Sequence, residues 1–290
     1  MICIHHNDLD GRCSAAIVNM TMKSPDYDIN FYEVDYSSNN LPLDKVKKDE
    51  PVIIVDFSLS DDNMKKLEAI TSDITWIDHH ATAKNYYYQN LNGLRDFKDK
   101  SKAGCELAWE FYFPNIAIPE SVLLLGDYDK FSCKLEQCFN FHEGMKIEYN
   151  HPESPLWIKL FDGDRGDDVK RICANGVCCI NYRDIYYQDM LADFGYEAKF
   201  NGNTAFVANL YGFGSPPFGD IIDKYDFIIS YIYNGKTYSV SLYSKKIDVS
   251  IIAKKYGGGG HKGASGFSCE ELPFKPLNIK LEKSNKQKGI

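Results

Sequence analysis

The sequence predicts an α/β protein with a parallel-sheet N-terminal domain and a smaller C-terminal α/β domain. Near the N-terminus, short β-branched runs alternate with helical patterns, and this alternation implies a parallel sheet. After Gly195 the pattern changes to short strands and turns, with a hairpin signal at Asn234-Gly235. The 290 residues, 44% of them hydrophobic, are enough to build two such domains.

Three strand patterns organise the N-terminal domain. Residues 1–5 form an apolar run, which is followed by a helical pattern over residues 12–22. Residues 51–56 are rich in β-branched side chains and end in an acid, and Ser60 is placed to cap the helix that follows. Residues 74–78 form a third strand that has the composition of a buried one. Because ligands gather at the carboxyl ends of parallel strands, we expect the acids and histidines after these strands to lie along one edge.

The rest of the chain supplies helices and then short strands. Helical patterns cover residues 103–113, 119–125 and 168–194, and the last is interrupted at Gly176. We expect strands over 204–210, 227–233 and 237–243, a helix over 248–256 and a glycine-rich loop over 257–260. The expected divisions are an N-terminal domain at 1–175, a helical linker at 176–195 and a C-terminal domain at 196–290, with the active site in the cleft between the domains.

Composition restricts the class of protein. No run approaches the roughly 18 apolar residues of a membrane span, and the N-terminus has no signal-peptide pattern, so we expect a cytoplasmic protein without a membrane partner. The nine cysteines have no CxxC spacing, which favours free thiols over disulfides or a zinc ribbon. The net charge of −8 disfavours a surface that binds long nucleic acid through many phosphate contacts. Any nucleic-acid substrate is therefore expected to be short.

Acidic and histidine side chains concentrate at the predicted strand ends. His6, Asp8 and Asp10 occupy alternate residues, so in an extended segment their side chains point into one pocket. Asp56 and His79 follow two other strands and are natural partners for that pocket. Carboxylates bind hard divalent cations, and imidazole adds a preference for Mn²⁺ or another transition ion over Ca²⁺. The pattern therefore predicts a metal site in the N-terminal half.

Two positions in this metal site have a competing neighbour. Asp127 follows a helical pattern and is the preferred ligand, while Asp129 stands two residues further on and is the alternative. His5 competes in the same way with His6, and His6 is preferred. Each acid or histidine alone is common in a solvated loop or as a helix cap, so the prediction depends on the set as a whole.

Four short motifs follow one another in the order found in a known family. They are residues 6–11 (HNDLDG), 55–56 (VD), 78–80 (DHH) and 126–131 (GDYDKF). The chain resembles the DHH phosphoesterases, which include RecJ-like exonucleases, nanoRNases, pAp phosphatases, cyclic-dinucleotide phosphodiesterases and family II pyrophosphatases. Residues 258–261 (GGGH) are similar to the glycine-rich signature of the DHH-associated C-terminal domain. The resemblance therefore covers nearly the whole chain.

The resemblance implies two divalent metal ions, Mn²⁺ first and Mg²⁺ as the alternative. One ion would be bound by His6 and Asp8, the other by Asp10, His79 and Asp127, and Asp56 would bridge the two. His80 would face the substrate phosphate, and Asp78 would orient the histidines. The implied substrate-binding residues of the C-terminal domain are Gly258, Gly259, Gly260, His261, Tyr243 and Ser244. Many relatives carry an arginine where this chain has Tyr243, which would instead stack on a base or donate a hydrogen bond.

By this resemblance the protein is a phosphoric ester hydrolase in which two metals activate a water molecule. We expect a nanoRNase-like exonuclease that cleaves phosphodiester bonds of short oligonucleotides, because the acidic charge disfavours long strands. The alternative is a pAp phosphatase or a phosphodiesterase for linear or cyclic dinucleotides. A third hypothesis, of a different class, is a nucleotide-binding module without catalysis. The expected partners are short oligonucleotides or small nucleotides, and a second copy of the chain in a homodimer.

Overall fold

The structure, a computed structural model, describes residues 1–24, 28–36, 41–98, 101–162, 167–210 and 214–277. The chain divides into two compact units, Met1–Ile180 and Asn181–Ile290, and each contains one β-sheet. The predicted α/β fold, with a parallel N-terminal sheet and a second sheet in the C-terminal half, is confirmed. Among the described helices, none combines the length and the apolar character needed to span a bilayer.

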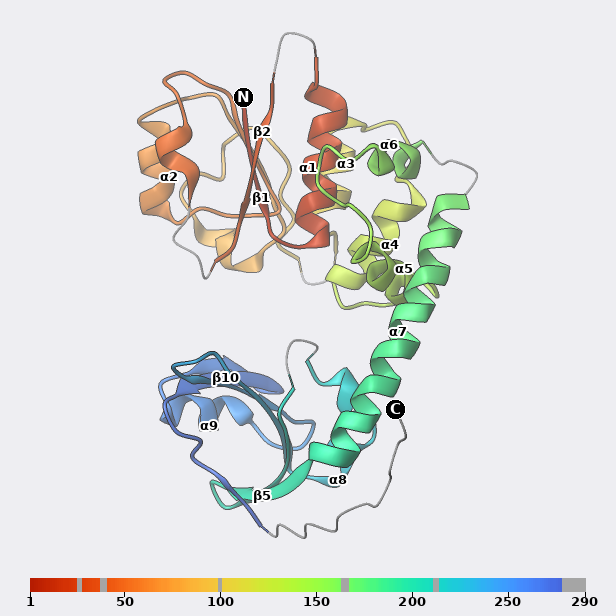
Figure 1. The fold of residues 1–290 in the computed structure, drawn as a ribbon. Coiled ribbons are helices and arrows are strands. Elements are labelled where there is room, and N and C mark those ends of the chain that lie inside the picture. Colours follow the sequence, from red (N-terminus) through yellow and green to blue (C-terminus); the bar gives the residue numbers. More distant parts are fainter. Residues whose placement is uncertain (25–27, 37–40, 99–100, 163–166, 211–213, 278–290) are drawn as a thin grey trace. The chain divides into compact units, whose positions relative to one another are not determined.

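The N-terminal sheet consists of parallel strands in the order β2-β1-β3-β4 (Figure 1). The strands are β1 (Ile2–His6), β2 (Asn30–Val34), β3 (Val52–Val55) and β4 (Ile74–Ile77). Three of them match predicted strands, whereas β2 was not predicted because exposed Asn30 and Glu33 interrupt its apolar pattern. The parallel arrangement brings the carboxyl ends of β1, β3 and β4 to one edge of the sheet.

Helices cover both faces of this sheet, with α1 and α2 on opposite sides (Figure 1). The helices are α1 (Leu9–Met22), α2 (Asp61–Glu68), α3 (Gly104–Tyr112), α4 (Glu120–Asp129), α5 (Cys138–Met145) and α6 (Pro155–Phe161). Short 3₁₀ segments lie at Pro42–Lys45, Ala81–Asn85 and Pro216–Phe218. Alternate residues of β1 enter different cores: Cys3 packs on the side of α1 and α3, and Ile4 on the side of α2. Both faces are therefore apolar, as buried parallel strands require.

Local capping sets where these helices begin and end. Asp8 caps α1 by accepting a hydrogen bond from Gly11 N at 2.8 Å, so the helix begins before the predicted residue 12. Ser60 caps α2 through Asn63 N, as the sequence predicts. Helix α4 does not end at residue 125 as predicted but continues through Gly126 to Asp129. The acids of the fourth motif therefore lie on the last turn of a helix.

Helix α7 (Asp167–Phe194) is continuous, so the predicted interruption at Gly176 is wrong. A Cβ atom at Gly176 would lie 1.8 Å from the carbonyl oxygen of Asn140. The glycine is therefore explained by close packing of α7 against α5, not by a break in the helix. The division between the two compact units falls inside this helix, after Ile180.

The C-terminal unit contains a mostly antiparallel sheet in the order β11-β5-β6-β7-β8-β10-β9. Its strands are β5 (Tyr196–Phe200), β6 (Asn203–Ala208), β7 (Phe227–Tyr233), β8 (Tyr238–Tyr243), β9 (Gly259–His261), β10 (Ala264–Cys269) and β11 (Lys275–Pro276). Helices α8 (Ile221–Lys224) and α9 (Val249–Lys255) complete the unit. The predicted glycine-rich loop at 257–260 is wrong for Gly259 and Gly260, because both belong to β9, which pairs with β10 as an antiparallel hairpin.

Candidate metal centre

The carboxyl ends of three neighbouring strands supply the site. His6 is the last residue of β1, Asp56 follows β3, and His79 lies just beyond the end of β4. Asp56 has a φ of 53°, a left-handed backbone conformation that non-glycine residues rarely adopt. Such a conformation persists only where the surrounding structure holds it in place, and it is common at functional sites.

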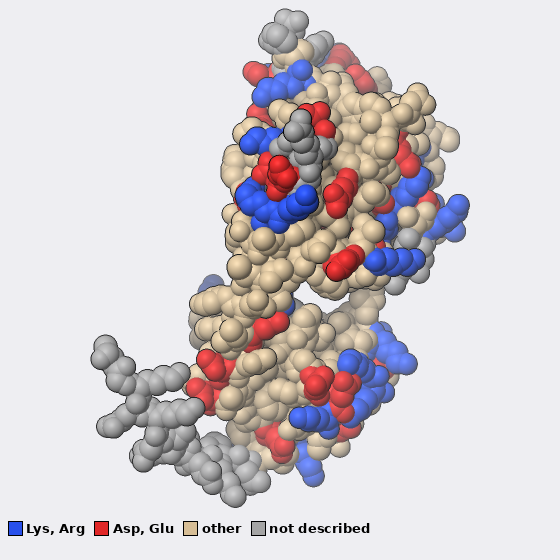
Figure 2. All heavy atoms as spheres, turned by 90° about the vertical axis from the view of Figure 1, so that its right-hand side faces the viewer, with Lys and Arg blue, Asp and Glu red and all other residues tan. Residues whose placement is uncertain are grey.

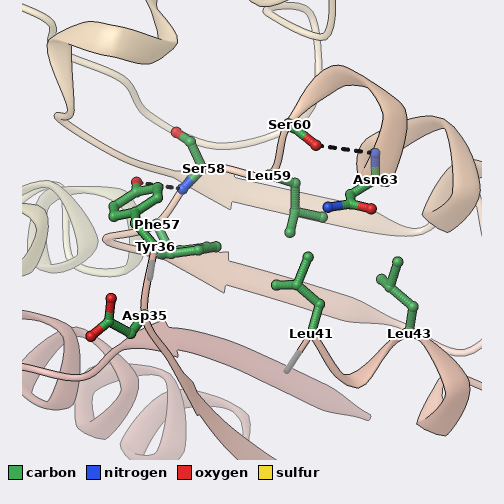
Figure 3. A pocket seen from close by; sticks show the side chains of 9 residues that line it. All are labelled: Asp35, Tyr36, Leu41, Leu43, Phe57, Ser58, Leu59, Ser60 and Asn63. Atoms are coloured by element: carbon green, nitrogen blue, oxygen red, sulfur yellow. Dashed lines mark hydrogen bonds between the residues drawn. The ribbon is translucent and has the colours of Figure 1, made fainter. Parts of the chain in front are cut away.

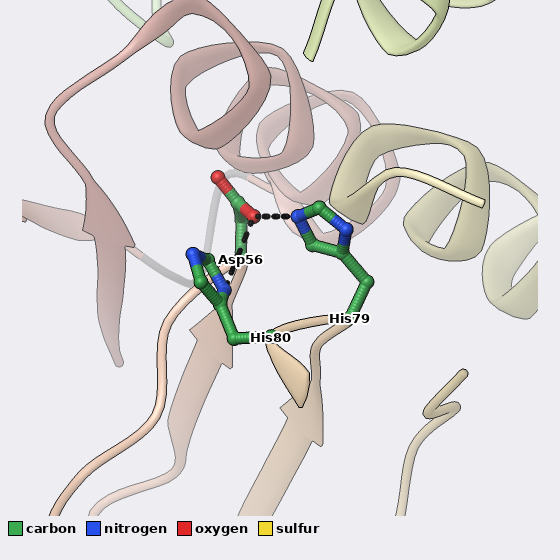
Figure 4. A group of neighbouring side chains, drawn as sticks. All are labelled: Asp56, His79 and His80. Atoms are coloured by element: carbon green, nitrogen blue, oxygen red, sulfur yellow. Dashed lines mark ion pairs between the residues drawn. The ribbon is translucent and has the colours of Figure 1, made fainter. Parts of the chain in front are cut away.

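Asp56 is the central acid of the site. Its side chain is fully buried, and neither carboxylate oxygen accepts a hydrogen bond from any described residue. His79 and His80 both point toward it, with His79 Nε2 3.1 Å and His80 Nδ1 3.9 Å from Oδ1 (Figure 4). Burial, and then the charge of Asp10, raise the pKa of Asp56 well above its ordinary value. A buried carboxylate of this kind requires a cation for its ionised form.

The His79 ring lies close to carboxylates from three elements. Besides Asp56, its Nε2 atom lies 3.4 Å from Asp129 Oδ2 and 3.6 Å from Asp10 Oδ2. The Asp10 carboxylate is itself held by the N-terminus of α3, where Gly104 N and Cys105 N each donate to it at 2.8 Å. The helix terminus fixes the direction of this carboxylate because its amides and dipole attract negative charge.

A second group forms on the other side of Asp56. His6 Nδ1 lies 2.7 Å from Asp8 Oδ2 and 3.8 Å from Asp56 Oδ2. Burial alone would raise the pKa of Asp8, but the hydrogen bond and charge of His6 outweigh it and hold the pKa at about 2. The competing residue His5 is buried on the opposite side of β1 and its Nδ1 contacts the carbonyl oxygen of His6 at 2.9 Å. The geometry therefore brings His6, and not His5, to the acids.

Asp78 holds His80 in place. Its Oδ1 atom lies 2.7 Å from His80 Nδ1, and Ser58 Oγ donates to its other oxygen. Burial would lower the pKa of His80, but the hydrogen bond and charge of Asp78 outweigh it, so the pKa is raised. Asp78 therefore contacts His80, whereas the Nε2 atom of His79 points to Asp56, Asp129 and Asp10.

The structure brings Asp129 to the site in place of Asp127. The Asp127 carboxylate faces the following loop, where it accepts hydrogen bonds from Ser132 Oγ and from Leu135 N, the latter at 2.7 Å. Asp129 is two residues further on, at the last position of α4, and burial followed by the charges of Asp10 and Asp8 raises its pKa to about 8. The structure thus places Asp129, the alternative ligand, beside His79 and directs the preferred Asp127 away from it, because residues two apart on a helix point to different sides.

These side chains form overlapping groups whose ligand atoms lie within 4.8 Å of one another. We call their members together the Asp56 cluster: His6, Asp8, Asp10, Asp56, His79, His80 and Asp129. Asp56 belongs both to a group with His6 and Asp8 and to a group with His79 and His80, while Asp10 and Asp129 share His79. The donor set combines carboxylates and imidazoles, carries excess negative charge, and includes two Asp56 oxygens that accept no hydrogen bond from the described residues, so it fits hard divalent cations such as Mn²⁺ or Mg²⁺.

A pair that sequence reasoning missed supports this site. Glu106 accepts hydrogen bonds from Ala103 N at 2.7 Å and from Lys130 Nζ at 2.5 Å, and so links α3 to the end of α4. A Cβ atom at Gly126 would lie 2.9 Å from the Glu106 carboxylate, which explains this glycine. A glutamate three residues after the start of a helical pattern is a capping signal that would have found Glu106.

The predicted substrate-binding residues of the C-terminal unit differ in their exposure and in their hydrogen bonds. Gly258 to His261 lie at or beside the edge strand β9, where Gly259, Gly260 and His261 are exposed. Tyr243 ends β8 and is partly buried against the core around Ile228. Ser244 is buried, and its hydroxyl donates to Asp226 O at 2.7 Å while accepting from two backbone amides of the following turn. The Ser244 hydroxyl is thus occupied by the turn, so its predicted role in binding substrate has no support in the geometry.

Comparison with known proteins agrees with this arrangement. Residues 1–125 match the model of the DHH family, N-terminal domain. This segment belongs to the DHH family. The matched segment contains the first three motifs of the DHH domain, and the recognition made from the sequence is confirmed.

Similarity to other proteins extends beyond residues 1–125. An uncharacterised protein of Acanthamoeba polyphaga mimivirus, R106, is 26% identical over 261 residues, which cover 81% of this chain and 58% of the relative. The chain thus spans less than two thirds of that protein. The pGpG-specific phosphodiesterase PggH from Vibrio cholerae has a TM-score of 0.58 at 13% identity and 93% coverage of both chains. Exonuclease RecJ bound to manganese has a TM-score of 0.51 at 12% identity, covering 93% of this chain and 86% of that one. The chain therefore shares its fold with these two proteins.

Proposed function

We propose that the protein is a metal-dependent phosphoric ester hydrolase that cleaves phosphodiester bonds of short oligonucleotides. The observation that carries this proposal is Asp56, a fully buried carboxylate with two oxygens that accept no hydrogen bond from the described residues. Each oxygen faces a different group of ligands, with His79 near Oδ1 and His6 near Oδ2. This is the arrangement expected of an acid that bridges two cations.

In this proposal the chain's own residues hold the ions and the phosphate. His6 and Asp8 hold one cation, and Asp10, His79 and Asp129 hold the other. Asp129 here takes the place of Asp127, which is preferred from the sequence alone. Two divalent cations would lower the pKa of a water molecule and offset the charge of the phosphate. The N-terminus of α3 keeps Asp10 directed toward the site through Gly104 N and Cys105 N.

His80 is proposed to contact the phosphate directly. Its Nδ1 atom faces Asp78, so its Nε2 atom is the one left to donate a hydrogen bond to a phosphate oxygen. Ser58 keeps the Asp78 carboxylate from rotating by donating to the oxygen that His80 does not use. A fixed donor of this kind stabilises the charge that develops on the phosphate as the bond breaks.

We infer the class of substrate from the net charge of the chain and from the glycine-rich segment of the C-terminal unit. The chain has a net charge of −8, and on the face shown in Figure 2 basic residues are interspersed with acidic ones. Such a surface favours short substrates, since long nucleic acid needs many clustered phosphate contacts. The exposed residues Gly259, Gly260 and His261, together with Gly258 and Tyr243, are proposed to bind the nucleotide from the C-terminal domain. A cytoplasmic location and a homodimer remain predictions.

A second candidate is the hydrolysis of pAp or of linear or cyclic dinucleotides. It is favoured by the fold shared over 93% of both chains with a protein named as a pGpG-specific phosphodiesterase. The two candidates use the same chemistry at the Asp56 cluster and differ only in the length and shape of the substrate.

The test is hydrolysis of pAp, pGpG, a cyclic dinucleotide and a five-nucleotide RNA by the purified protein, with Mn²⁺ or Mg²⁺ and with EDTA as control. The proposal predicts metal-dependent cleavage, fastest on the five-nucleotide RNA. A higher rate on pAp or a dinucleotide favours the second candidate. Tight nucleotide binding without hydrolysis in any metal would instead indicate a binding module without catalysis.

A further inference from the structure

A pocket of about 400 Å³ in the N-terminal unit adjoins the Asp56 cluster (Figure 3). Leu41 and Leu43 face Leu59 and Asn63 across it, so that leucine side chains stand on both sides of an open slot whose lining is part apolar and part polar. This volume lies within the range of about 300–1,000 Å³ that is typical of small-molecule sites. The residues belong to the segment after β2, to the segment that joins β3 to α2, and to α2 itself, which carries Asn63; none of them is among the predicted site residues.

Aromatic rings connect this pocket with the Asp56 cluster. Tyr36 and Phe57, which line the pocket, stack with ring centroids 4.4 Å apart. The Tyr36 ring also lies 5.3 Å from the ring of His80 and 5.6 Å from that of His6. Tyr36 is nevertheless 49% exposed, which is unusual for a large aromatic side chain with this many ring neighbours. The ring therefore offers a surface for stacking next to the position where the phosphate is proposed to bind.

The Tyr36 hydroxyl fixes the direction of this ring. Its oxygen accepts a hydrogen bond from Ser58 N at 3.1 Å, and the same residue donates its side-chain hydroxyl to Asp78. The backbone and side chain of Ser58 therefore hold both Tyr36 and the residue that orients His80. A ring held in this way loses little freedom when a flat ligand stacks on it.

The polar groups of the pocket suit the edge of a base better than a second phosphate. The Asn63 amide lies at the end away from Tyr36, and because its Oδ1 atom accepts from Lys66 Nζ at 3.4 Å, its Nδ2 atom is the group left to donate to an acceptor on a base edge (Figure 3). Asp35, which also lines the pocket, is an acid that would repel a phosphate. Leucine walls, an aromatic ring and an amide are together the chemistry of a base-binding site.

We propose that this pocket holds a nucleobase of the substrate while the attached phosphate reaches the Asp56 cluster. The proposal rests on the function proposed above and adds that the substrate is recognised as a nucleotide by the N-terminal unit itself. The base lies between the leucine walls and stacks on Tyr36, and Asn63 contacts its edge. Inorganic polyphosphates and base-free phosphodiesters lack the group that this pocket binds.

The experiment compares a nucleotide with its base-free counterpart on the Mn²⁺-loaded protein. Calorimetric affinities of AMP and ribose 5-phosphate give the contribution of the base, which we expect to be about tenfold to 100-fold in favour of AMP. Leu43→Trp fills the pocket and is expected to abolish this preference, whereas Leu43→Met preserves the volume and keeps it. Tyr36→Leu is expected to reduce the preference, and Tyr36→Phe to retain most of it.

The outcomes separate this proposal from the proposed function. Equal affinities for AMP and ribose 5-phosphate, or a preference that survives in a folded Leu43→Trp variant, overturn the base pocket even if the protein hydrolyses dinucleotides. A preference that disappears in Leu43→Trp and persists in Leu43→Met supports the pocket even if no phosphodiester is cleaved. Thermal melts of each variant establish that it is folded, and the two substituted positions provide independent tests.

Discussion

Asp127 and Asp129 should respond in opposite directions to the same substitution in metal-free protein. Asp129→Asn removes a carboxylate that is crowded by Asp10 and Asp8, so it should raise stability. Asp127→Asn removes a carboxylate that accepts from Ser132 and from Leu135 N, so it should lower stability. The sequence places these two acids almost equivalently, and only the geometry separates them.

The size of the Asp129 effect follows from its pKa, which is raised from 3.8 to about 8. At about 1.4 kcal/mol for each pKa unit, this range sets an upper bound of about 6 kcal/mol. The side chain is 25% exposed, and solvent screening reduces the expected gain to about 1–3 kcal/mol. Below the pKa that Asp129 has in the unfolded chain, its side chain is protonated in both the folded and the unfolded state and does not change the free energy of unfolding. As the pH rises toward 8, only the unfolded state ionises freely, so wild-type stability is lost and the asparagine variant avoids that loss.

The size of the Asp127 effect follows from its hydrogen bonds. Burial would raise the pKa of Asp127, but the bonds from Ser132 and Leu135 outweigh it and the pKa is lowered. A lowered pKa contributes stability above the unfolded value, and this contribution is therefore present at neutral pH. An asparagine presents an amide N–H₂ where the loop needs an acceptor, which should cost about 1–3 kcal/mol.

The assay is thermal unfolding in EDTA at several pH values between 5.5 and 8, repeated with Mn²⁺. For a unit of this size, each kcal/mol shifts Tm by about 2–4 °C. We expect Asp129→Asn to raise Tm, most at pH 8, and to lose the stabilisation that Mn²⁺ gives to the wild type. Asp127→Asn should lower Tm at every pH and keep the response to Mn²⁺. The reverse pattern would refute the assignment of Asp129 to the Asp56 cluster.

Three further predictions address the supports of the site. Lys130→Met removes the ion-pair partner of the buried Glu106 carboxylate and should lower the free energy of unfolding by about 3–5 kcal/mol. Urea titration measures this loss, and an unchanged midpoint would show that the pair is not buried in solution. Gly104→Ala places a Cβ atom 2.6 Å from Asp56 Cβ and should lower Tm and weaken Mn²⁺ binding, whereas Gly259→Ala meets no atom within 4 Å and should leave Tm unchanged; equal effects would contradict the packing argument. Asp78→Asn should lower the pKa of His80 in metal-free protein, followed by imidazole NMR, and an unchanged titration would exclude Asp78 as its main partner.

The N-terminal fold could be predicted because its strands are apolar runs with clear boundaries. Strands β1, β3 and β4 follow from β-branched composition, and the capping residues Asp8 and Ser60 mark the helices after them. Strand β2 could not be predicted in this way, because it is an edge strand of the sheet and its exposed residues obscure the pattern. Pairing with β1, which the sequence does not reveal, is what makes this segment a strand.

The sequence predicts which types of residue form the site and how they are spaced, but it does not always decide between two neighbouring residues of the same type. His6 was separable from His5 only through the direction of β1, since alternate strand residues point to opposite faces. Asp129 was separable from Asp127 only once α4 was seen to extend past Gly126, because the extension decides which side of the helix each acid faces. The base pocket left no motif, since it combines ordinary leucines with Tyr36 and Asn63 from separate segments.

The most direct test of the account is the number of Mn²⁺ ions bound by wild-type protein and by Asp56→Asn, measured by calorimetry with metal analysis. A two-metal centre bridged by Asp56 should bind two ions per chain in the wild type, and both should bind more weakly in Asp56→Asn, because one carboxylate contacts both groups of ligands. Circular dichroism of the variant should match that of the wild type. A variant that still binds two ions with wild-type affinity, or a wild type that binds none, would contradict a two-metal centre bridged by Asp56.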